Sequence, residues 1–181
     1  MIKYLSILVL LLFVMISTAQ SRKVNYHPCF LTDSVDSKLT FIKQNAGRIF
    51  IDSFDCKETL LDSIAIRFVR TKELKYLDAL TAIQQNPYAK ADGLFTDVVR
   101  LLVEDDFSGF VNQLYQGRGR YLPLQNELIA AMNMIVNGRP LKQKYMGQLN
   151  VDIETAKDSN DKYRLSYLEK LKQKIEGEQY H

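Results

Sequence analysis

The sequence predicts an all-α fold of six to eight helices, preceded by a cleavable signal peptide. Three observations lead to this expectation. Apolar residues recur at helical spacing from about Asp33 onward, turn residues separate these stretches by short connections, and the chain opens on one short apolar run. Because short connections favour antiparallel neighbours, we expect an irregular bundle or a stack of antiparallel helical hairpins.

Residues 1–19 have the order of charged, apolar and small residues that is typical of a secretory signal peptide. Lys3 is the only charged residue among the first 21, and an apolar run over residues 7–16 follows it. Small and polar residues end the run, so we predict cleavage between Ala19 and Gln20. A membrane-spanning helix needs roughly 20 apolar residues, and this run is shorter. We therefore expect a secreted or periplasmic protein with no stable membrane span after cleavage.

Residues 20–54 are expected to form an N-terminal segment with one helix and an extended connector. The apolar face of that helix is formed by Val35, Leu39 and Ile42. The connector, residues 48–54, has strand-like composition, with Ile-Phe-Ile between polar residues, but it is too short to found a sheet.

The chain has two cysteines, Cys29 and Cys56, both near its N-terminal end. An even pair in an oxidising compartment is most simply a disulfide, which would tie the N-terminal segment to the start of a later helix. A catalytic thiol assisted by His27 is the alternative, but the spacing matches no known nucleophile arrangement.

Residues 55–177 form the predicted helical core, and residues 178–181 a frayed tail. Thr71 is placed to cap the second helix of the core, and Pro123 suits the first turn of a later one. Residues 137–140 read as a helix stop followed by a helix start. The expected apolar stripes fall within residues 60–69, 74–83, 94–102, 107–115, 124–135, 141–156 and 163–175.

Composition and charge exclude several classes of function. The net charge is +3 for the whole chain and +2 without residues 1–19, so no strong basic field attracts nucleic acid. His27 and His181 are the only histidines, and the sequence contains no Gly-rich phosphate loop, Cys-x-x-Cys pair or Gly-x-Ser-x-Gly elbow. We therefore expect no catalytic set, no metal site and no cofactor, although an enzyme that uses scattered acidic residues would escape this search.

The densest acidic cluster is Glu104-Asp105-Asp106. Paired carboxylates could serve as acid and base in a small helical hydrolase that acts on an envelope polymer. The other interpretation is structural: Asp105 or Asp106 caps the helix that begins near Phe107, where a negative charge also suits the helix dipole.

Basic and tyrosine residues are interleaved between residues 113 and 149. The candidate binding residues of this stretch are Arg118, Arg120, Tyr121, Arg139, Lys142 and Lys144. The connections at 117–122 and 137–140 flank one helix, so we expect them roughly 20 Å apart as two separate patches. These residues either contact a carboxylate, a phosphate or an acidic protein surface, or they form an ordinary solvated face with half-buried tyrosines.

These observations predict a non-catalytic binding or interaction module. Its expected partner is another exported protein or an anionic envelope component, and not nucleic acid. The helix-rich pattern and the Gly- and Arg-bearing connections favour this interpretation, and the small helical hydrolase is the alternative.

Overall fold

The computed structural model describes Leu39, residues 57–85 and residues 93–177. Its described elements are α3 (Lys57–Thr71), α4 (Leu74–Gln84), α5 (Leu94–Gln116), α6 (Leu122–Asn133), β1 (Ile135–Val136), β2 (Arg139–Pro140), α7 (Leu141–Asp158) and α8 (Lys162–Gly177). The described part of the chain is therefore mostly helical, which confirms the predicted all-α class. None of its helices is both long and apolar enough to cross a membrane.

Some of the predictions concern residues outside the described ones. These are the signal peptide at 1–19, the connector at 48–54, the Cys29–Cys56 disulfide and the tail at 178–181. Within the segment 20–54, Leu39 alone is described, and it is helical and buried in the core.

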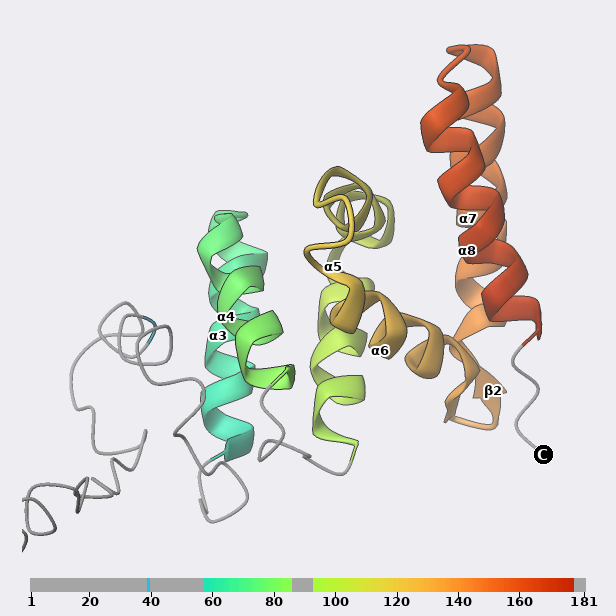
Figure 1. Cartoon of the computed structure of the whole chain (residues 1–181). Coiled ribbons are helices and arrows are strands. Elements are labelled where there is room, and N and C mark those ends of the chain that lie inside the picture. Colours follow the sequence, from blue (N-terminus) through green and yellow to red (C-terminus); the bar gives the residue numbers. More distant parts are fainter. Residues whose placement is uncertain (1–38, 40–56, 86–92, 178–181) are drawn as a thin grey trace, which may run out of the picture.

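The helices follow one another in space as three pairs (Figure 1). α3 packs on α4, α5 on α6, and α7 on α8. α3 also packs on α5, and α6 on α7 and α8, so the middle pair lies between the other two. One continuous apolar core runs through all six helices, from Leu61 in α3 to Ile175 in α8.

Most residues of the predicted apolar stripes are buried, and α7 is the clearest case, whereas Leu74, Ile135 and Tyr163 are exposed. Leu141, Tyr145, Leu149, Ile153 and Ala156 are all buried, as residues three and four apart on one helical face should be.

Hydrogen bonds between buried and partly buried polar residues connect the pairs. The Glu127 carboxylate of α6 accepts hydrogen bonds from Gln84 of α4 (3.1 Å) and Thr96 of α5 (2.9 Å). Ser108 of α5 donates to the buried Asp152 of α7 at 2.7 Å. Such satisfied contacts fix how the helices sit on one another, because breaking one would leave a polar group buried without a partner.

Two local predictions were wrong. Thr71 ends α3, and the N-cap residue of α4 is Glu73, which makes no side-chain capping hydrogen bond; the Thr71 hydroxyl accepts only from the Glu73 N–H, at 3.3 Å. The helix start predicted at residues 137–140 is confirmed, since α7 begins at Leu141, but the helix stop is wrong because α6 already ends at Asn133. Asn137 and Gly138, with φ of 51° and 77°, form a two-residue turn that pairs Ile135 with Pro140 across β1 and β2.

The β-hairpin changes the environment of Ile135. This residue is 70% exposed, although its spacing placed it on the buried stripe of α6. α6 ends two residues earlier, at Asn133.

Candidate functional site

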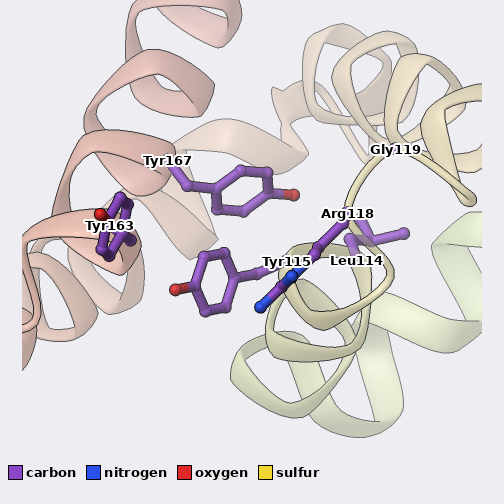
Figure 2. A pocket seen from close by; sticks show the side chains of 6 residues that line it. All are labelled: Leu114, Tyr115, Arg118, Gly119, Tyr163 and Tyr167. Carbon is purple, nitrogen blue, oxygen red and sulfur yellow. The ribbon is translucent and has the colours of Figure 1, made fainter.

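A cleft of about 710 Å³ lies between the C-terminal end of α5 and the first two turns of α8 (Figure 2). Six residues line it: Leu114, Tyr115, Arg118, Gly119, Tyr163 and Tyr167. We call it the tyrosine cleft. Its volume is in the range of small-molecule and short-peptide sites, and its lining is mainly aromatic and apolar with one cationic side chain.

A sharp bend brings α5 to this position. Asp106 leaves the helical conformation, with φ of −153° and ψ of 89°, and its carboxylate accepts a hydrogen bond from the Gly109 N–H at 2.9 Å. Asp106 thus caps the second half of α5, as the sequence predicted for Asp105 or Asp106. The second half therefore runs in a different direction from the first (Figure 1) and carries Leu114 and Tyr115 to the cleft.

The turn after α5 forms one wall of the cleft. Arg118 and Gly119 have positive φ, 46° and 89°. The turn is closed by the Arg118 N–H, which donates to the Tyr115 carbonyl at 3.1 Å, and by the Leu122 N–H, which donates to the Gly119 carbonyl at 3.1 Å. A non-glycine residue with positive φ is uncommon, and here this conformation places Arg118 beside the tyrosines.

Two of the three tyrosine rings pack against each other. The ring centroids of Tyr115 and Tyr167 are 5.4 Å apart and their planes are tilted by 45°. Figure 2 shows the Tyr167 hydroxyl directed from α8 toward the turn that carries Arg118. This hydroxyl is buried and has no hydrogen-bond partner among the described residues, and burial raises the pKa of the Tyr167 phenol. It therefore remains a neutral donor at physiological pH.

Tyr163 forms the outer edge of the cleft and is 85% exposed. A large aromatic side chain in that position is available to a partner, because little of its ring is covered by the protein itself.

Arg118 brings an uncompensated charge to the cleft. Its side chain is exposed and forms no ion pair or side-chain hydrogen bond with any described residue. No acidic residue is among the six that line the cleft. Since an arginine remains charged at every physiological pH, this wall of the cleft attracts anions.

Arg120 and Tyr121 follow Arg118 by two and three residues, but their side chains contact another helix of the fold. Arg120 forms an ion pair with Asp78 of α4 at 2.5 Å, and the Tyr121 hydroxyl donates to the same carboxylate at 3.0 Å. Tyr121 is buried, and burial together with the Asp78 hydrogen bond raises its pKa to about 12. These contacts attach the turn to α4.

The other three predicted binding residues lie at the opposite end of α6. Arg139 is exposed on β2, Lys142 of α7 donates to Asn133 at 2.9 Å, and the Lys144 ammonium lies 4.8 Å from the centroid of the Tyr145 ring. The 12 residues of α6 correspond to about 18 Å, so the two sets stay apart, as expected.

The sequence analysis assigned Tyr163 and Tyr167 to the core stripe of α8 and did not connect them with Arg118. A helical wheel could have separated Tyr163 from that stripe. At about 100° per residue, Tyr163 lies about 80° to 140° around the helix from the buried Leu168, Leu171 and Ile175. On the same helical wheel Tyr167 lies between Tyr163 and the buried residues, and it is half-buried.

The acidic cluster lies outside the tyrosine cleft. Asp105 forms an ion pair with Lys72 at 2.5 Å, Asp106 caps the second half of α5, and Glu104 is exposed. In the described ranges no group of three or more His, Cys, Asp or Glu residues could hold a metal ion. The hydrolase hypothesis is thus left without a carboxylate in the cleft.

Comparison of the chain with protein-family models, with curated proteins and with solved structures finds no match. We therefore argue function from the geometry of the tyrosine cleft.

Proposed function

We propose that the protein is an exported, non-catalytic binding module and that the tyrosine cleft is its binding site. The observation that carries this proposal is an exposed Arg118, without an ion pair to any described residue, beside three tyrosines around one cavity. The partner is another exported protein or an anionic component of the cell envelope.

The side chains of the cleft are those that contribute most to binding energy at protein interfaces. Tyrosine and arginine are enriched among such residues, because each combines a large contact area with hydrogen-bond donors.

Export is part of the same proposal and rests on the signal-peptide pattern of residues 1–19. N-terminal sequencing of the protein purified from its source cells should give a chain that starts at Gln20. Thiol labelling with and without reductant should show Cys29 and Cys56 protected until reduction. A cytosolic chain that retains Lys3 would contradict the export proposal.

The binding proposal is tested by affinity capture from an envelope extract with matched variants. Tyr163→Ala and Arg118→Gly alter exposed residues of the cleft, whereas Arg139→Ala and Lys144→Ala alter exposed cations away from it. We expect the two cleft variants to lose a partner, identified by mass spectrometry, that wild type and both control variants retain.

The opposite pattern would refute the assignment of the site. If the partner is lost with Arg139→Ala or Lys144→Ala and retained by both cleft variants, the patch at the start of α7 is the contact surface. If all four variants retain the same partners, none of these side chains mediates binding.

A further inference from the structure

The side chains that line the tyrosine cleft offer more hydrogen-bond donors than acceptors. The Arg118 guanidinium has donors only. Leu114 and Gly119 have no side-chain hydrogen-bond donor or acceptor. Three phenolic oxygens are the side-chain acceptors of this lining, and the buried Tyr167 hydroxyl has no hydrogen-bond partner among the described residues. A matching ligand is therefore rich in acceptors and poor in donors.

The shape of the lining places a second requirement on the ligand. Tyr115 and Tyr167 are tilted by 45°, and Tyr163 stands at the rim, so the rings form angled walls instead of a flat stack. Because Tyr115 and Tyr167 already contact each other, a flat, apolar group packs on the outer faces and edges of these rings and on the exposed Tyr163. The free charge of Arg118 adds a third requirement, which is an anionic group close to those apolar groups.

Building on the proposed function, we infer that the ligand is an acidic, proline-containing peptide segment in the polyproline II conformation. Proline rings are flat and apolar, their backbone nitrogens carry no hydrogen, and the carbonyls of this helix point outward as unpaired acceptors. Aromatic-lined grooves recognise such segments without a large ordering cost, because the segment is already extended. A neighbouring Asp or Glu pairs with Arg118.

A saccharide fits these groups less well. Sugar hydroxyls are donors as well as acceptors, and no carboxylate or amide side chain lines the cleft to receive their hydrogen bonds. An acidic oligosaccharide would satisfy Arg118 but would leave most of its own donors without partners.

The backbone of Arg118 supports a role in binding. Its φ of 46° is a conformation that is unfavourable for every residue with a Cβ atom and favourable for glycine. The residues on either side, Gly117 and Gly119, are glycines, but residue 118 is an arginine. The arginine side chain forms no ion pair or hydrogen bond with a described residue that would offset this cost, and a ligand carboxylate would provide such a bond.

The test uses a fluorescent peptide in which a run of prolines is flanked by aspartates, titrated against the purified chain. One control peptide replaces the prolines with alanines, a second replaces the aspartates with lysines, and an oligogalacturonate represents acidic saccharides. We expect binding of the first peptide only. Tyr163→Ala and Arg118→Gly should each weaken it by about tenfold or more, and Arg139→Ala should leave it unchanged. Added salt should weaken binding to wild type more than to Arg118→Gly.

Two results would overturn the inference. One is equal binding of the proline and alanine peptides. The other is binding of the oligogalacturonate in place of the peptide. If capture from the envelope extract still depends on Tyr163 and Arg118, the tyrosine cleft remains the binding site and only its ligand class is wrong. If neither the peptide nor the captured partner depends on these residues, the proposed function fails as well.

Discussion

Arg118 and Arg120 are two residues apart in one turn, yet their surroundings are opposite. Arg120 is paired with Asp78, which also accepts the hydrogen bond of the buried Tyr121. Arg118 has no such contact and lines the tyrosine cleft. One side of the turn, formed by Arg120 and Tyr121, therefore attaches it to α4, and we call it the structural side. The other side, formed by Arg118, is available to a ligand.

The difference comes from a helix that is distant in sequence. α4 provides the carboxylate for Arg120, whereas α8 faces Arg118 with tyrosines only. Two basic residues in one glycine-rich turn thus have different roles because of what packs beside them. The predictions below test this division, from the largest expected change in stability to the smallest.

Gly117→Ala tests how tightly the structural side is packed. A Cβ atom at this position would lie 2.5 Å and 2.9 Å from two ring carbons of Tyr121, which is buried and cannot move away freely. We expect the free energy of unfolding to fall by about 1–3 kcal/mol, measured by urea denaturation. Gly147→Ala is the control, because nothing lies within 4 Å of its Cβ on α7. It should leave stability unchanged or slightly raised. Equal effects of the two changes would contradict this packing.

Asp78→Ala removes the acceptor shared by Arg120 and Tyr121. The Tyr121 hydroxyl would then be buried without a partner, so we expect a loss of about 2 kcal/mol in the same denaturation experiment. Asp97→Ala breaks the exposed pair with Arg100, whose atoms are 3.6 Å apart, and should cost well below 1 kcal/mol. If Asp78→Ala costs no more than Asp97→Ala, the structural role of the carboxylate is refuted.

Tyr121 also gives stability a dependence on pH. Its pKa is raised from 10.0 to about 12, so the unfolded chain loses this proton at lower pH than the folded protein does. The stabilisation is complete below pH 10 and is lost as the pH rises toward 12. Wild type should therefore lose on the order of 2 kcal/mol relative to Tyr121→Phe across this window. Denaturation curves of the two proteins from pH 8 to pH 12 provide the measurement, and a constant difference would contradict the assignment.

Arg118→Gly should have the smallest effect on stability. Glycine relieves the positive φ of this residue but adds freedom to the unfolded chain, so we expect stability to stay the same or to rise by up to about 1 kcal/mol. Arg120→Ala should lower it slightly through loss of the Asp78 pair. Destabilisation by Arg118→Gly that exceeds the Arg120→Ala effect would show that Arg118 belongs to the structural side.

Much of the fold could be predicted because helical spacing is a local signal. The stripe of α7 and the break at Asp106 follow from side chains within a few residues of each other. The β-hairpin was missed because strands of two residues are too short to show alternation, although Asn137-Gly138 is a known signal for such a turn.

The tyrosine cleft could be predicted only in part. Arg118 was identified from its place in a glycine-rich turn, but no local pattern distinguishes it from Arg120, because the difference depends on the position of Asp78. Tyr163 and Tyr167 follow Arg118 by more than 40 residues, and only the packing of α8 beside the end of α5 brings them together. Contacts of this kind depend on tertiary structure, which local patterns do not determine.

The most direct test is to map the binding surface by nuclear magnetic resonance. Backbone amide shifts of the isotope-labelled protein would be followed while the aspartate-flanked proline peptide is added. We predict that the largest changes occur at Tyr115, Arg118, Gly119, Tyr163 and Tyr167, and that they disappear in Tyr163→Ala. Changes centred on Arg139, Lys142 and Lys144, with the tyrosine cleft unaffected, would contradict the central claim.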